Sequence, residues 1–131
     1  MATATLKFVP ANIISLGAID GELVRYYGTI TFSAAADTYL TGGLLPLAGF
    51  DLKSLGPFAD RTPLWINVYS RAGSGWNYQW NNAAGKLKIF ATAAGNGTSA
   101  DQEATTATAL SAFAPNVFTD DIIFEAVFPR R

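Results

Sequence analysis

The sequence contains neither cysteine nor histidine. Without cysteine the chain can form no disulfide bond, no zinc-thiolate site and no reactive thiolate. Without histidine it can form no Ser-His-Asp triad and no histidine-ligated metal site, and it lacks the commonest general base. These two absences exclude much of ordinary enzyme chemistry. They predict a protein that is not an enzyme, with no catalytic residues, no metal and no cofactor.

Charged residues are also scarce. They make up 15% of the 131 residues, against about 25% in an average domain. Lys plus Arg is 9 and Asp plus Glu is 10, which gives a formal net charge of −1. A protein that binds nucleic-acid phosphates is expected to be basic, so no nucleic-acid partner is predicted. The surface is expected to consist largely of Ala, Thr, Ser, Asn and Gly. This composition favours a protein that stays in contact with other proteins.

The length is that of one domain, here residues 1–131. No stretch approaches the roughly 20 apolar residues that cross a bilayer, so no membrane partner is predicted. The first ten residues show no basic lead followed by an apolar run, as a signal peptide would. We therefore expect synthesis and folding in a cytoplasm.

Apolar and polar residues alternate with a period of two along most of the chain, which is the pattern of half-buried strands. Strands are predicted over the following segments: Thr3–Val9, Leu23–Phe32, Leu64–Arg71, Trp76–Trp80, Lys86–Phe90 and Ile122–Phe128. Shorter strands are predicted around Phe50–Leu55 and Glu103–Leu110, and an Asn/Gly turn predicts a hairpin from Trp76 to Phe90. About seven or eight short strands indicate an all-β fold, a single-domain β-sandwich of the jelly-roll kind.

Carboxylates are the remaining candidates for acid–base chemistry. They form three close pairs: Asp20 with Glu22, Asp101 with Glu103, and Asp120 with Asp121. A two-carboxylate hydrolase holds its pair roughly 5–9.5 Å apart across a sugar cleft, and nothing in the sequence forces such a cleft. The favoured interpretation is that these acids stabilise turns and strand entries.

Aromatic residues gather on two of the predicted strands. Trp76, Tyr78 and Trp80 alternate on one face, where the favoured interpretation is that they line the core. Trp65 and Tyr69 project from the polar face of their strand. For these two, core packing and an exposed surface that stacks a sugar ring or contacts a protein both stay open.

Several motifs follow one another in a distinctive order. They are Asp20-Gly21, Tyr27-Gly28-Thr29-Ile30-Thr31-Phe32, Tyr39-Leu40-Thr41-Gly42-Gly43, Trp76-Asn77-Tyr78-Gln79-Trp80 and Gly85-Lys86-Leu87-Lys88-Ile89-Phe90. An Ala/Gly/Thr-rich stretch and a final apolar strand come after them. From about Asp20 to Phe128 this order resembles the head decoration (cement) proteins of tailed bacteriophages.

The resemblance implies a virion structural protein with a β-sandwich or jelly-roll fold that assembles as a homodimer or homotrimer. Such a protein binds the major capsid protein on the outer surface of an icosahedral capsid, where capsid subunits meet, and stabilises the shell. Its expected location is the virion, after assembly in the host cytoplasm. No catalytic residue is implied.

Three groups of residues are candidate contacts with the capsid or another partner. An extended N-terminal arm is expected to add a strand to a neighbour's edge, and its deletion to weaken capsid binding while the domain still folds. The two aromatics of the Leu64–Arg71 strand and the terminal cations complete the set: Met1, Ala2, Thr3, Ala4, Thr5, Trp65, Tyr69, Arg130 and Arg131. The alternative function is a carbohydrate-binding β-sandwich that uses surface Trp and Tyr to bind a glycan, which is compatible with a place on a virion. Solvent exposure of those aromatics discriminates between the two functions, because sugar binding requires them at the surface.

Overall fold

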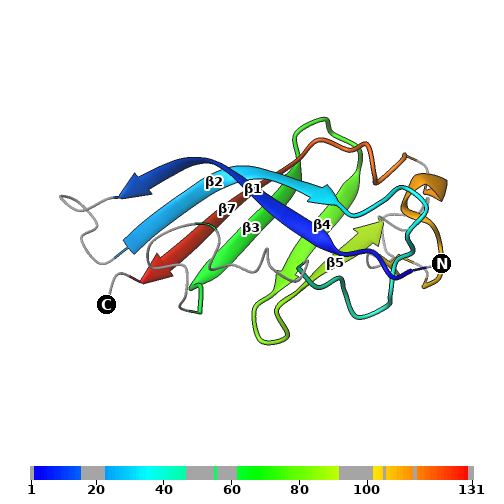
Figure 1. The fold of residues 1–131 in the computed structure, drawn as a ribbon, viewed down its shortest axis with the longest axis horizontal. Coiled ribbons are helices and arrows are strands. Elements are labelled where there is room, and N and C mark those ends of the chain that lie inside the picture. The colour runs from blue at the N-terminus through cyan, green and yellow to red at the C-terminus, as the bar shows by residue number, and fades with distance from the viewer. Residues whose placement is uncertain are drawn as a thin grey trace.

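The computed structural model describes residues 2–15, 23–46, 55, 62–91, 102–104, 106–113 and 115–129. These residues form one antiparallel sheet with the strand order β1-β2-β7-β3-β4-β5-β6 (Figure 1). The strands are β1 (Leu6–Ser15), β2 (Leu23–Phe32), β3 (Trp65–Ser70), β4 (Trp76–Asn81), β5 (Lys86–Ala91), β6 (Gln102–Glu103) and β7 (Ile122–Pro129). Because β6 has only two residues, the other six strands make up the body of the sheet.

The expected all-β class is confirmed, but the described strands do not form the two stacked sheets of a sandwich. They form a single sheet that curls into a half-barrel, and in Figure 1 the strand β1 crosses over its neighbours. Two ring contacts span the hollow inside. Phe8 on β1 meets Trp80 on β4 edge-on at 5.7 Å and Phe124 on β7 at 4.9 Å. The sandwich prediction failed because alternation shows only that one face of each strand is buried, not what buries it. A curled sheet buries that face against its own strands, without a second sheet.

A local irregularity accompanies the curl. The register between β1 and β2 shifts between Pro10 and Asn12, and Pro10 lies opposite Gly28. An extra residue in one strand bends it and increases the local twist. Gly28, inside the alternating strand β2, thus lies opposite this bulge.

The core fills the concave side of the sheet. On β2 every second residue from Val24 to Phe32 is buried, as the alternation predicts. The largest fully buried side chains come from several strands and from the segments between them: Tyr26, Tyr39, Phe8, Phe124, Phe128, Leu6, Leu44, Leu87, Ile89, Leu110, Ile122 and Val117. Each such side chain contributes about 1.5–3 kcal/mol through the area it removes from water.

Residues 38–46, here called the closing segment, join the two sides of the half-barrel. Leu44 exchanges two backbone hydrogen bonds with Leu87 on β5, of 2.8 and 2.9 Å, and the carbonyl of Leu45 accepts the N–H of Leu6 on β1 at 3.1 Å. The segment therefore lies between β1 and β5 at the end of the molecule that carries the N-terminus (Figure 1). No periodicity in the sequence indicated this connection, because single bridges need no alternating run.

Most predicted strands are found within a few residues of their expected limits. The hairpin of β4 and β5 is confirmed, and its turn ends on Gly85 at φ +66°. The predicted strand Glu103–Leu110 is wrong beyond its first residue. The chain turns at Ala107, which has φ +63°, and enters a short 3₁₀ helix at Leu110–Ala112. Of the predicted strand Phe50–Leu55, all but the buried Leu55 lies outside the described residues.

Candidate functional site

The outer, convex face of the sheet carries the two aromatic residues that the sequence left open. Trp65 and Tyr69 lie on the same face of β3 and are 40% and 54% exposed, whereas Ile66 and Val68 between them are buried. Both are therefore surface residues, and their rings are held by a strand paired on both sides. A row of mainly polar residues crosses the sheet between the two aromatics: Tyr27, Glu125, Asn67, Gln79 and Lys88.

We call Trp65, Asn67, Tyr69 and Gln79 the outer-face surface, and two ion pairs border it. Arg25 Nη1 lies 3.1 Å from Glu125 Oε1, and Arg71 Nε lies 2.8 Å from Asp121 Oδ2. The pairing with Asp121 raises the pKa of Arg71. Each of these charges thus has an opposite charge beside it, so the surface has little unbalanced charge for a ligand to meet.

A shallow hollow lies beside Tyr69. Its volume is about 220 Å³, and its lining includes the side chains of Tyr27, Thr29, Arg71 and Ile123. Pockets that enclose drug-sized ligands are larger, roughly 300–1,000 Å³. The hollow therefore suits one ring or one side chain at the end of a larger surface contact, and not a complete ligand.

The other aromatic strand belongs to the core, as the favoured interpretation had it. Tyr78 is 3% exposed, and Trp76 and Trp80 pack against the buried cluster. The Trp76 ring meets Phe113 edge-on at 5.3 Å, and its Nε1–H donates to the carbonyl of Pro115 at 2.8 Å. This strand supplies no exposed stacking surface.

The N-terminal residues are hydrogen-bonded into the fold. Ala4 is buried, its N–H donates to the carbonyl of Thr38 at 2.8 Å, and the N–H of Thr38 donates to the carbonyl of Ala2 at 2.9 Å. Thr5 exchanges bonds with Ser33. Ala2 and Thr3 remain exposed. The candidate contacts Met1, Arg130 and Arg131 lie outside the described residues.

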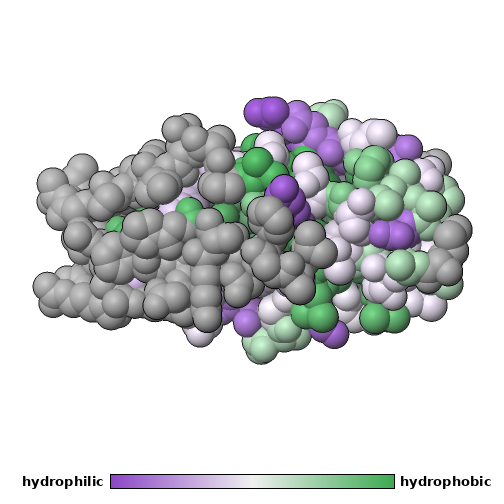
Figure 2. Space-filling model, in the orientation of Figure 1, coloured by the Kyte–Doolittle hydropathy of each residue, from purple (hydrophilic) through white to green (hydrophobic). Residues whose placement is uncertain are grey.

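The closing segment presents two large apolar side chains to solvent. Leu40 and Leu45 are 46% and 52% exposed, and neither Thr38–Pro46 nor Ala2–Leu6 contains a charged residue. Figure 2 shows the described part of one face of the molecule, where strongly hydrophilic residues form separate patches among neutral and mildly apolar ones. We call Ala2, Thr3, Leu40, Thr41 and Leu45 the N-terminal-end surface. The alternating pattern does not indicate these leucines, although two apolar residues around an uncharged Thr-Gly-Gly turn were an available signal.

A buried hydroxyl fixes the closing segment. Tyr39 is 1% exposed; its hydroxyl donates to Glu103 Oε1 at 2.8 Å and accepts the N–H of Ile89 at 3.2 Å. The same carboxylate oxygen accepts the N–H of Gly42 at 2.8 Å. Burial raises the pKa of Tyr39, and the neighbouring Glu103 raises it further, whereas the bond from Ile89 lowers it. At the edge of β5, the Tyr39 hydroxyl thus accepts the Ile89 N–H where a neighbouring strand would normally offer a backbone carbonyl. Ile89 lies between Leu87, which pairs with Leu44, and Phe90, which pairs with β6.

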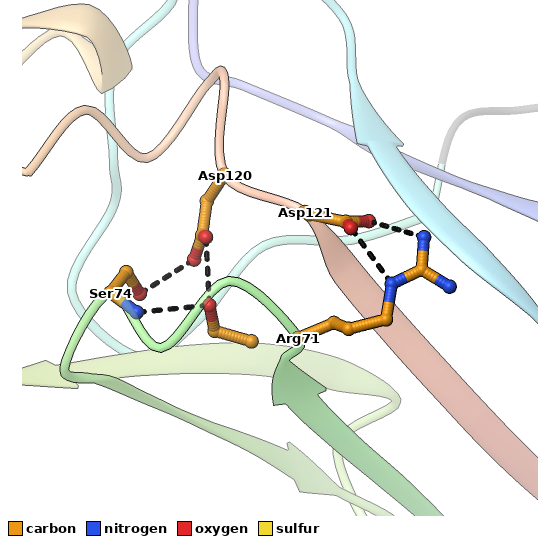
Figure 3. Close-up of polar contacts among 5 residues, drawn as sticks. Arg71, Ser74, Asp120 and Asp121 are labelled. Atoms are coloured by element: carbon orange, nitrogen blue, oxygen red, sulfur yellow. Dashed lines mark hydrogen bonds and ion pairs between the residues drawn. The ribbon is translucent and has the colours of Figure 1, made fainter.

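A second network surrounds Asp120 (Figure 3). Its carboxylate accepts hydrogen bonds from the hydroxyls of Ser70, Ser74 and Tyr78, at 2.8, 2.8 and 2.7 Å. Burial by itself would raise the pKa of Asp120, but these bonds outweigh it and hold the pKa below its usual range. Burial and the bond to Asp120 raise the pKa of Tyr78. The network ties the β3–β4 turn to the entry of β7.

The candidate carboxylates have structural partners wherever the structure describes them. Asp120 holds the β3–β4 turn, Asp121 pairs with Arg71, and Glu103 holds the closing segment. Asp20, Glu22 and Asp101 lie outside the described residues. Within the described ranges, no three acidic residues gather as metal ligands would. In the same part of the chain, no helix has the length and apolar character needed to cross a membrane.

Comparisons with known proteins give no further guide, since no protein-family model, no curated protein and no solved structure matches this chain.

Proposed function

We propose that this protein is a capsid decoration (cement) protein of a tailed bacteriophage. It binds the outer surface of an icosahedral capsid at junctions of the major capsid protein and stabilises the shell, and it has no catalytic activity. The motif order from about Asp20 to Phe128, which resembles that family, supports the proposal. Two of those motifs lie side by side in the fold: Tyr39–Gly43 belongs to the closing segment, and Gly85–Phe90 forms most of β5 with its turn.

The observation that carries the proposal is the N-terminal-end surface. Leu40 and Leu45 are exposed on a segment fixed by backbone bonds to both β1 and β5, and no charge interrupts it from Thr38 to Pro46. A rigid, uncharged segment with exposed apolar side chains suits a protein contact, because it binds without losing backbone entropy and without desolvating charge. We assign the contact with the shell to this surface.

Binding of this kind stabilises an assembled shell by linkage. A protein that contacts two neighbouring capsid subunits binds the assembled state and not the separated subunits, so its binding free energy favours assembly. A homodimer or homotrimer would multiply the effect, because several weak contacts then act together. The protein would reach the shell in the host cytoplasm and remain on the outside of the virion.

Co-sedimentation with purified capsids that lack the protein tests the proposal. Saturable binding at a fixed ratio to capsid subunits is expected, with a raised temperature of shell disruption and with the oligomer mass recorded beforehand. The double variant Leu40→Ser, Leu45→Ser should bind weakly while it unfolds at the same urea concentration. Its matched control is Tyr69→Ser, an exposed substitution on the outer-face surface, which should bind normally. Absence of saturable binding by the unaltered protein would overturn the proposal.

A further inference from the structure

We infer that the outer-face surface, made of Trp65, Asn67, Tyr69 and Gln79, is a second binding site whose ligand is a neutral polysaccharide. The site is separate from the N-terminal-end surface and does not depend on the function proposed above. Its two aromatics lie on one strand with an amide residue between them, and a second amide lies opposite the first on β4.

The polar groups at this surface are available to a ligand. The amides of Asn67 and Gln79 are exposed and have no hydrogen-bond partner among the described residues, and the same holds for the Trp65 indole N–H and the Tyr69 hydroxyl. An amide offers two donors and one acceptor, which matches the hydroxyl groups of a sugar, since each of these also donates and accepts. The surface therefore offers ring faces for stacking and free polar groups beside them.

The charges around this surface favour a neutral ligand. Two of the cations near this surface are already paired, Arg25 with Glu125 and Arg71 with Asp121, and Lys88 lies directly opposite Gln79. Lys88 is one cation, at the β5 end of the polar row. An acidic polymer is normally held by several unpaired cations. This surface lacks such a set among the described residues, so it complements an uncharged ligand.

The spacing of the two aromatics favours a ligand of several sugars. Trp65 and Tyr69 are four residues apart on one strand, so their Cα atoms are separated by about 13 Å at the usual rise per strand residue. A single sugar ring cannot reach both aromatics, whereas a chain of several sugars can. The hollow of about 220 Å³ beside Tyr69 offers space for one ring or branch at the end of that chain. The ligand class is therefore an oligomer of uncharged sugars.

A glycan array that carries neutral and acidic oligosaccharides tests the inference with the full-length protein, and titration calorimetry with the best soluble neutral oligosaccharide follows. We expect binding to neutral glycans of several residues. Trp65→Ala and Tyr69→Ala should each weaken it about tenfold or more, as loss of a central aromatic contact does. Tyr69→Phe keeps the ring and should weaken it less than Tyr69→Ala. Leu45→Ala, an exposed apolar residue on the other surface, is the matched control and should bind as the unaltered protein does.

Several results would overturn the inference. They are a lack of neutral ligands on the array, a preference for acidic glycans, or neutral binding that survives Trp65→Ala and Tyr69→Ala in protein shown to be folded by its unfolding transition. Loss of capsid co-sedimentation in Trp65→Ala, with no glycan bound by the unaltered protein, would instead assign this face to a protein partner. Because the capsid test depends on Leu40 and Leu45, failure of either proposal leaves the other standing.

Discussion

The hydroxyl of Tyr39 donates a hydrogen bond of 2.8 Å to a carboxylate oxygen of Glu103, a residue 64 positions further along the chain. The same hydroxyl accepts the N–H of Ile89, and the same carboxylate oxygen accepts the N–H of Gly42. One buried side chain thus connects the closing segment to β5 and β6, beside the single bridge of Leu44 to Leu87 and the short β5–β6 pairing.

Replacement of Tyr39 by Phe should therefore destabilise the protein. The Ile89 N–H would lose the hydroxyl that accepts it, and Glu103 would lose a donor, which together cost about 1–3 kcal/mol. Urea unfolding of the variant measures this difference. Tyr69→Phe is the control, because that hydroxyl is exposed, and its expected effect is within about 0.5 kcal/mol. Equal stabilities for the two variants would show that the Tyr39 hydroxyl does not hold the closing segment.

Gly43 should tolerate alanine far less well than its neighbour Gly42. Both have a positive φ, of +115° and +103°, so alanine is strained at either position. A Cβ on Gly43 would also lie 2.9 Å from Lys86 Cβ and 3.0 Å from the Leu87 carbonyl oxygen, whereas nothing lies within 4 Å of one on Gly42. We expect Gly42→Ala to cost about 1 kcal/mol and Gly43→Ala at least about 1 kcal/mol more. Thermal unfolding of the two variants measures the difference. Equal unfolding midpoints would contradict the close packing of the closing segment against β5.

How much of this arrangement the sequence revealed depends on the range of each interaction. The strands Leu23–Phe32 and Lys86–Phe90 were predictable because alternation is a local property, and so was the core position of Tyr78. The pairing of the closing segment with β1 and β5 was not, since it rests on single bridges between distant residues. Exposure of Trp65 stayed open for a related reason: a strand pattern shows which residues share a face, but not whether another layer covers that face.

Stability should fall in acid through Asp120. Its pKa in the folded protein lies below its usual value of about 3.9, because three hydroxyls donate to the charged form. A carboxyl with a lowered pKa contributes stability above its unfolded pKa and loses it as the pH falls through the folded value. Asp120→Asn should therefore cost about 1–3 kcal/mol at pH 7 and lessen the loss of stability below about pH 4. The neighbouring Asp121→Asn removes a more exposed ion pair and should cost less than about 1 kcal/mol. Urea unfolding from pH 7 to pH 2.5 checks both, and parallel curves for Asp120→Asn and the unaltered protein would contradict the assignment.

Deletion of residues 1–5 should weaken the fold itself. Ala4 is buried, and backbone bonds join Ala2 and Ala4 to Thr38 and Thr5 to Ser33. At about 1 kcal/mol for each lost bond, with the lost burial added, the deletion should cost about 2–4 kcal/mol. Urea unfolding of the truncated protein measures it, with Thr3→Ala at an exposed position as the control. If truncation leaves stability unchanged, these residues form an independent arm and their deletion becomes a clean test of capsid binding.

Binding to the capsid should depend little on salt. None of the residues from Ala2 to Leu6 or from Thr38 to Pro46 is charged, so the apolar part of this contact offers no ion pair for salt to screen. We expect the dissociation constant to change less than about threefold between about 0.05 and 0.5 M NaCl, because only charge-based contacts weaken steeply over that range. Co-sedimentation at each salt concentration measures it, with Leu40→Ser as the variant that should bind weakly throughout. A strong weakening with salt would instead indicate a charged contact. The variant Arg130→Ala, Arg131→Ala would then show whether the two C-terminal cations supply it.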